Sequence, residues 1–236
     1  MESLLFKNSI SITDDISICI PSVKEVLDNE LDYFGLVTTL TAMPIDLMVQ
    51  LDDIGIDFEQ IDEYQLFLIM FGAIKNIDTS LVFGDLDLSL FEHGYNEDIN
   101  EDVLIDTTND IVIDRVVHNQ IANTLRRIHN LEKNIKKPGN AEAKAYMLER
   151  ARKKQKRNAR KNKHSFLEAK IISLVNTEQF KYNYQEVKDI TIYQFNQSVK
   201  QITNKINYDN RMFGIYTGNI DTKKLSQKEL TWMHDE

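Results

Sequence analysis

The most concentrated chemistry in the sequence is a run of basic side chains near its middle. Nine of the fourteen residues from 150 to 163 are Lys or Arg. A helix this basic can neutralise several phosphates of RNA or DNA, but no nucleic-acid-reading motif and no aromatic residue for base stacking lies within it. Three interpretations stay open: nucleic-acid binding, contact with an acidic protein surface of this or another chain, and a solvated surface. The candidate interaction residues are Arg150, Arg152, Lys153, Lys154, Lys156, Arg157, Arg160 and Lys161.

Residue types that bind metals are present without the spacing of a metal site. His118 and His129 share one predicted helix, but eleven residues separate them by about 16 Å, too far for one metal ion. The acidic residues 84–87 and 97–102 lack the full EF-hand pattern with its mid-loop glycine. Cys19, the only cysteine, alternates within a predicted strand and is expected to be a buried structural thiol. We therefore expect satisfied or solvent-facing histidines, solvated acidic loops, and no metal or other cofactor.

Motifs that would indicate an enzyme are missing. Gly214 and Gly218 lack the Lys-Ser/Thr that follows them in a phosphate-binding loop, and there is no HExxH sequence. The 37 Asp and Glu residues allow many accidental acid–base pairs, and nothing in the sequence selects one. We expect a protein that is not an enzyme, with no catalytic residues.

Charge is distributed unevenly along the chain. Residues 1–114 hold three Lys or Arg and 25 Asp or Glu, a charge of −22, whereas residues 115–164 carry +13 and residues 165–236 are neutral. Self-association, a basic partner for one end and an acidic partner for the other are all compatible with this polarity. The longest apolar run, residues 66–74, is about half the length that spans a bilayer. We expect neither a membrane span nor a standard secretion signal.

The N-terminal elements that must carry these residues are mixed. Residues 3–20 predict a β-hairpin with a turn at 13–15, and Ser22 with Glu25 has the spacing of a capping box that opens a helix ending at Pro44. Short helices are predicted over 45–54 and from about 63 through the apolar run. The strand candidates that follow are 81–84, 86–91, 103–105 and 111–113, with a hairpin turn at 107–110 and a mobile acidic loop at 92–102.

Long helices dominate the rest of the chain. The apolar stripe from Val117 to Leu131 predicts one helix, the breakers at 136–140 end it, and residues 141–162 predict a second helix that pairs with it as an antiparallel hairpin. A short helix over 166–175 precedes a long one over about 191–206, whose apolar residues form a heptad-like seam that is expected to face the core. The tail from Gly218, with Trp232 near its end, is expected to pack back on the body.

These elements predict an α+β fold that is mainly α. It consists of an N-terminal β-hairpin with helices and a small β region, a basic helical hairpin and a C-terminal helical section. The expected sections are an acidic mixed α/β domain over residues 1–113, the basic hairpin over 114–164 and the C-terminal section over 165–236. In the last section, Tyr216 and Trp232 are candidate docking residues.

Stretches spread over most of the chain carry a family resemblance. The most distinctive are Gly214-Ile215-Tyr216-Thr217-Gly218 and Leu230-Thr231-Trp232. With them, the sequence resembles virion-morphogenesis proteins of tailed phages and prophages of low-GC Gram-positive hosts. The other stretches that carry the likeness are 57–61, 64–67, 81–86, 171–176, 180–184, 192–195, 198–199, 208–210 and 221–224.

The resemblance implies a phage tail assembly chaperone that acts through protein–protein contacts, with tape-measure or tail-tube protein as its partner. A structural component of the virion, in the tail or connector, is an alternative, as is a nucleic-acid-binding module that uses the basic helix. The implied location is the host cytoplasm, or the virion itself. The family supplies no catalytic residues to transfer.

Overall fold

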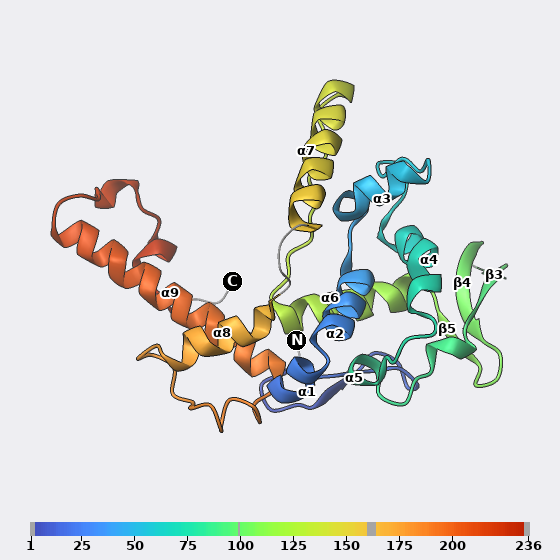
Figure 1. Ribbon diagram of the computed structural model, residues 1–236, viewed down its shortest axis with the longest axis horizontal. Helices are drawn as coiled ribbons and strands as arrows, with labels where there is room; N and C mark the ends of the chain where they lie inside the picture. The colour runs from blue at the N-terminus through green and yellow to red at the C-terminus, as the bar shows by residue number, and fades with distance from the viewer. Residues whose placement is uncertain (1–2, 99, 160–163, 234–236) are drawn as a thin grey trace.

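The structure is a computed structural model, and it describes residues 3–98, 100–159 and 164–233. Helices make up most of it, and two small antiparallel sheets complete it (Figure 1). The predicted α+β, mainly α class is confirmed. The elements in chain order are β1 (Ser9–Ser11), β2 (Ser17–Cys19), α1 (Val23–Asp28), α2 (Glu30–Thr41), η1 (Pro44–Leu47), α3 (Met48–Asp53), α4 (Glu63–Ile74), α5 (Ser80–Phe83), η2 (Leu88–Leu90), β3 (Glu92–Asn96), β4 (Glu101–Asp106), β5 (Ile111–Ile113), α6 (Arg115–His129), α7 (Ala141–Ala159), α8 (Phe166–Val175), α9 (Ile192–Tyr216), η3 (Thr222–Lys224) and η4 (Gln227–Leu230).

The N-terminal hairpin forms as predicted, with shorter strands. Ile10 lies opposite Ile18 in the β1–β2 pair, and the Thr13 hydroxyl accepts from the backbone N–H of Ile16 at 3.0 Å to close the turn. Ser22 and Glu25 form the predicted capping box. The helix that was expected to run to Pro44 is divided at Asn29 into α1 and α2.

The second sheet differs from the prediction for residues 92–102. Residues 92–96 form β3 and residues 101–102 begin β4, in an antiparallel ladder in which Gly94 lies opposite Val103, so most of this segment is sheet and not a mobile loop. A Cβ at Gly94 would lie 2.6 Å from Ile105 Cδ1, so a larger residue here would require the Ile105 side chain to move. The turn at 107–110 is confirmed: the Asp106 carboxylate accepts from the N–H of Thr108 at 2.8 Å, and Asp110 has a φ of 58°.

Two predicted strands are helical turns instead. Residues 81–84 lie in α5 and its cap, where Gly84 ends the helix with a φ of 63°. Residues 86–91 contain η2, which Asp87 caps by accepting from the N–H of Ser89 at 2.8 Å. Both strand predictions were wrong because a short apolar run has the same appearance in a buried strand and in a helical turn.

Helix α6 crosses the body and organises its core. Asp114 caps it by accepting from the N–H of Val117 at 2.8 Å, and Ile121, Leu125 and Ile128 are fully buried. The helix packs against α2, α4, α9, β2 and β5. One cluster of buried apolar side chains extends from Leu4 to Phe195 and includes residues of all three predicted sections. The division of the chain into these sections stays a prediction.

The predicted antiparallel pairing of the two central helices, α6 and α7, does not form. Helix α7 packs against α3 and projects from the body at a steep angle to α6 (Figure 1). The reason is that the apolar stripe of α6 is already occupied by the body, while α7 has no buried residue with which to compete for it. Helix α9 projects in another direction, and the C-terminal tail folds back on it through η4 (Figure 1).

Candidate interaction surfaces

The proximal part of α7 is held on the acidic N-terminal section by ion pairs. Lys144 Nζ lies 2.5 Å from Asp57 Oδ1 and 2.9 Å from Glu59 Oε2, and it is 5.0 Å from the ring centroid of Phe58. Its hydrogen bond to Asp57 is the main reason why the pKa of Asp57 is lowered. Contact between basic and acidic parts of one chain was one of the open interpretations of the sequence, and it accounts for this part of α7.

Arg152 forms the second half of this contact, two turns further along the helix. Its Nη2 lies 2.6 Å from Asp52 Oδ2, and its Nη1 lies 2.7 Å from Asp53 Oδ1. Between the two cations, Met147 packs against a small apolar cluster that contains Leu51 and Phe58. We call these contacts of Lys144, Met147 and Arg152 the α7 clasp. All of its ion pairs are partly exposed, so salt screens them.

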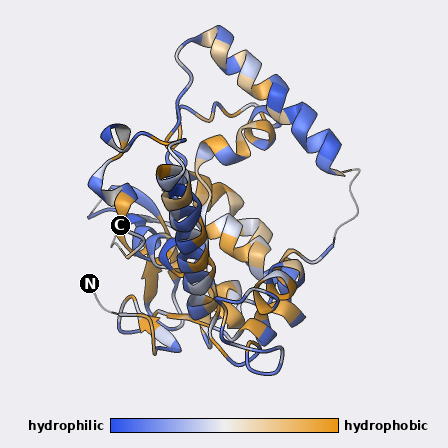
Figure 2. Ribbon diagram, turned by 90° about the vertical axis from the view of Figure 1, so that its left-hand side faces the viewer, coloured by the Kyte–Doolittle hydropathy of each residue, from blue (hydrophilic) through white to orange (hydrophobic). Residues whose placement is uncertain are grey.

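The remaining cations of α7 leave a second face of the helix charged. Arg150, Lys153, Lys154 and Arg157 follow the spacing i, i+3, i+4, i+7, which places them on one face; we call this face the basic stripe. All four are exposed. Lys153 pairs with Glu149 at 2.5 Å, whereas Arg150, Lys154 and Arg157 have no carboxylate partner among the described residues. Figure 2 shows this end of α7 as almost continuously hydrophilic.

The other predicted basic-helix residues are not part of the stripe. Arg152 belongs to the clasp, and Lys156 is exposed beside the stripe. Arg160 and Lys161 lie outside the described residues. The basic helix as an interaction site stays a prediction, and the fold separates the cation that holds the helix, Arg152, from those that are exposed.

The distal half of α9 carries an apolar face that the body does not cover. Ile192 and Phe195 are buried, whereas Ile206, Phe213 and Tyr216 on the same seam are 40%, 70% and 84% exposed. We call these three residues the aromatic stripe, after the two exposed rings of Phe213 and Tyr216. Tyr216 was predicted from the sequence as a docking residue and Phe213 was not, although the spacing of seven between Ile206 and Phe213 continues the seam.

The C-terminal tail covers a different face of α9. Arg211 Nη1 donates to the Glu229 carbonyl at 2.7 Å, and Lys205 Nζ lies 6.0 Å from the ring centroid of Trp232. The Ile220 side chain lies so close to Gly214 that a Cβ there would be 2.6 Å from Ile220 Cδ1. Trp232 thus belongs to an internal contact, and the structure separates it from the exposed Tyr216. The tail packs back as expected, but on α9 rather than on the body.

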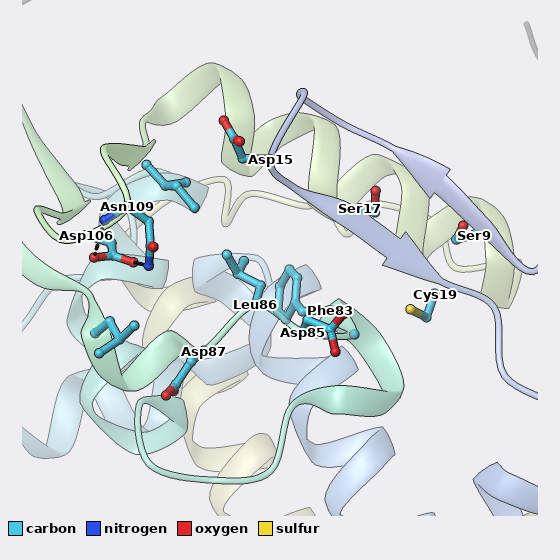
Figure 3. A pocket seen from close by; sticks show the side chains of 13 residues that line it. Ser9, Asp15, Ser17, Cys19, Phe83, Asp85, Leu86, Asp87, Asp106 and Asn109 are labelled. Carbon is cyan, nitrogen blue, oxygen red and sulfur yellow. Dashed lines mark hydrogen bonds between the residues drawn. The ribbon is translucent and has the colours of Figure 1, made fainter.

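An open cavity of about 590 Å³ lies between the β1–β2 hairpin, the α5–η2 segment and the β4–β5 turn. Asp15, Asp85, Asp87 and Asp106 line it together with the apolar Leu86 and Ile111, among other residues (Figure 3). We call it the acidic cavity. Residues 84–87 were predicted to be a solvated loop, and no local signal in the sequence indicates that the hairpin lies beside them.

Cys19 also lines the acidic cavity, where it is half-buried rather than buried as predicted. Burial raises the pKa of its thiol, and the nearby Asp85 adds to the effect. The thiol is therefore poorly suited to act as a nucleophile. Among the described residues, no three His, Cys, Asp or Glu side chains are placed to hold a metal ion. None of the described helices combines the length and the apolar character needed to cross a bilayer.

Comparison with known proteins relates the C-terminal part of the chain to phage proteins. No curated protein and no solved structure matches the sequence. Residues 154–235, which run from the middle of the basic stripe through α8, α9 and the tail, match the model of the YomV second-domain family. YomV is a Bacillus prophage protein, so this part of the chain is similar to a phage-associated family.

Proposed function

We propose that this protein is a non-enzymatic phage tail assembly chaperone that holds a helical client on the distal half of α9. The observation that carries the proposal is the aromatic stripe. It is the continuation of a seam that packs against helix α6 in the body, and it emerges on a projecting helix with Phe213 and Tyr216 exposed. The phage-associated family match covers the whole of this helix.

The stripe has the chemistry of a site for another helix. Apolar residues at heptad spacing are what one helix offers to a second, and aromatic side chains commonly supply most of the binding energy of such contacts. The tail contacts Arg211 and Gly214 of α9, and the rings of Phe213 and Tyr216 stay exposed beside it. A client with an apolar stripe of its own, such as the helical part of a tape-measure protein, would cover the exposed rings.

Asp209 makes the seam suited to a contact that must be released. It occupies the seam position between Ile206 and Phe213 and pairs with Lys205 of its own helix at 2.6 Å. A charge in the seam lowers the affinity of helix pairing. A chaperone that gives up its client as the tail tube grows needs this kind of moderate affinity, whereas a permanent virion contact does not.

The proposal is tested by co-expressing the protein with the tape-measure or tube protein of the phage that encodes it. Phe213→Ser/Tyr216→Ser removes the exposed rings without touching the core, and we expect recovery of the client to fall by roughly tenfold or more, as for the loss of two aromatic anchors. The matched control is Phe6→Ser/Leu31→Ser, since both residues are exposed (88% and 74%) and lie outside α9. Equal client recovery with the two double variants would contradict the α9 site.

The same phage separates a chaperone from a structural component. A chaperone leaves the particle, so mass spectrometry of purified virions should find this protein absent or far below the amount of the tail proteins. Recovery in stoichiometric amount would overturn the chaperone proposal and favour a structural role in the tail or connector.

A further inference from the structure

The basic stripe and the acidic cavity are complementary surfaces on one molecule. The stripe offers four cations on one face of a projecting helix, with Arg150, Lys154 and Arg157 lacking a carboxylate partner among the described residues. The cavity offers Asp15, Asp85 and Asp87, which also pair with no cation in the part of the chain that the structure describes. Opposite charge on two unpaired surfaces favours contact between them in the orientation that brings them together.

The composition of the cavity suits Lys and Arg in particular. Apolar side chains, including Leu86 and Ile111, line it together with the carboxylates, and Figure 3 shows Leu86 among them. A long basic side chain buries its aliphatic stem on such walls while its charged end reaches the carboxylates. The clasp is an example within the chain itself, because Lys144 lies over the ring of Phe58 while it pairs with Asp57 and Glu59.

The two surfaces cannot meet within one molecule as it stands. Helix α7 projects from one side of the body, and α5 and the N-terminal hairpin lie on the opposite side (Figure 1). We propose that the basic stripe of one copy docks in the acidic cavity of a second copy. The contact is head-to-tail, since each copy uses two different surfaces, and such contacts produce rings or open chains rather than closed two-fold dimers.

A second copy fits the stripe better than a nucleic acid does. The chain carries a net charge of −9 and 25 Asp or Glu in its first 114 residues, and this excess of negative charge disfavours the approach of a polyanion. These carboxylates attract the basic stripe of another copy in one orientation. This inference does not depend on the α9 client site, and a variant of one surface leaves the other intact.

Sedimentation velocity of the full chain over a concentration series tests the proposal. At about 50 mM salt the wild type is expected to form assemblies larger than dimers, and at about 0.5 M salt, where screening is strong, to sediment as a monomer. Arg150→Gln/Lys154→Gln/Arg157→Gln and Asp85→Asn/Asp87→Asn should each abolish association. Asn at position 87 can still cap η2. The matched controls, Lys181→Gln/Lys188→Gln/Lys223→Gln and Glu97→Gln/Asp98→Asn, change charge by the same amount at exposed sites and should associate like the wild type.

Mixing the two interface variants gives the decisive result. The Gln variant retains the cavity and the Asn variant retains the stripe, so an equimolar mixture should form a one-to-one dimer and nothing larger. A wild type that stays monomeric at low salt, or a mixture that stays monomeric, would overturn the proposal. If such a monomeric wild type also bound RNA or DNA at low salt through the same three cations, the stripe would be a nucleic-acid surface instead.

Discussion

Polar side chains of α6 occupy the interior of the body. His118 is 2% exposed, its ring stacks on Phe67 with 4.3 Å between centroids, and its Nε2 is the one buried side-chain nitrogen or oxygen without a partner among the described residues. His129 Nε2 lies 3.0 Å from the Tyr33 hydroxyl. The expectation of satisfied or solvent-facing histidines is thus correct for His129 and wrong for His118. A buried ring nitrogen without a partner lowers stability.

These histidines make the free energy of unfolding depend on pH. Burial desolvates the imidazolium and lowers the pKa of His118, like that of His129, to about 4. An unfolded chain binds protons with a histidine pKa of about 6.5. Between these two pKa values the unfolded state binds protons that the folded state does not bind. The free energy of unfolding therefore keeps its full value at neutral pH and decreases as the pH falls. Each histidine contributes a slope of about 1.4 kcal/mol per pH unit.

We predict that His118→Leu reduces this dependence. Urea unfolding of the wild type at pH 6.5 and at pH 5 should differ by about 2 kcal/mol for His118 alone, and the variant should lose that part while keeping the part due to His129. His164→Gln, at an exposed position, is the control and should behave like the wild type. An unchanged pH slope in the His118 variant would contradict the assignment.

Arg126 is the second buried polar residue of α6. It is 6% exposed, pairs with Glu63, and donates to the Thr41 carbonyl at 2.6 Å. In Arg126→Met, Glu63 keeps only Lys133 as a cation partner among the described residues, at 2.9 Å. We predict that this variant lowers the free energy of unfolding by about 3 kcal/mol, because one partner of a buried ion pair is removed. Arg126→Met/Glu63→Leu should recover part of this loss in urea unfolding. A double variant less stable than the single one would show that the carboxylate is not the source of the penalty.

At the scale of elements, α7 is attached to the body by few contacts. It has no buried residue, and the clasp joins it to α3 and residues 57–59. Because the clasp is built from partly exposed ion pairs, it contributes to the position of α7 far more than to the stability of the core.

We predict that Lys144→Gln/Arg152→Gln releases α7 without unfolding the protein. Amide hydrogen exchange in residues 141–159 should become faster, while exchange in α6 and the urea midpoint should stay unchanged. Salt should have the same effect on the wild type. Lys153→Gln/Lys156→Gln, which removes two exposed cations outside the clasp, is the control. Faster exchange throughout α6 in the clasp variant would mean that α7 supports the core.

At the scale of the whole molecule, one core joins the segments. Leu167 and Phe195 are buried in the same cluster as Leu36 and Leu125. The backbone N–H of Val23 donates to the Ile190 carbonyl at 2.9 Å, and that of Ile192 donates to the Pro21 carbonyl at 2.8 Å. The segment that matches the YomV second-domain family therefore shares its interior with the N-terminal section.

We predict that residues 154–236 do not fold alone. The fragment would expose the apolar faces of α8 and of the first turns of α9, which share a core with the N-terminal section and α6 in the full chain. Circular dichroism should show partial helix without a cooperative thermal transition. Co-expression with residues 1–153 should restore the transition. A sharp unfolding transition of the fragment by itself would contradict the shared core and support independent sections.

The sequence by itself determined the features whose energies are local. The Ser22–Glu25 capping box, the turn at 107–110, the span of α8 and the seam of α9 follow from side chains within a few residues of one another. Charge polarity belongs to the same class, because it is a property of composition. Among the predictions that failed, those at residues 81–84, 86–91 and 92–102 concern short segments whose local preferences are weak.

Only the tertiary structure decided which charged and aromatic residues are available to partners. Arg152 and Asp52 are one hundred residues apart, and no local pattern marks Arg152 as the cation that docks while Arg150 stays exposed. In the same way, Ile192 and Tyr216 lie on one seam, but the first is buried and the second is 84% exposed. The reason is that burial depends on what the rest of the chain brings alongside a helix face, whereas the sequence of the helix specifies only which residues share that face.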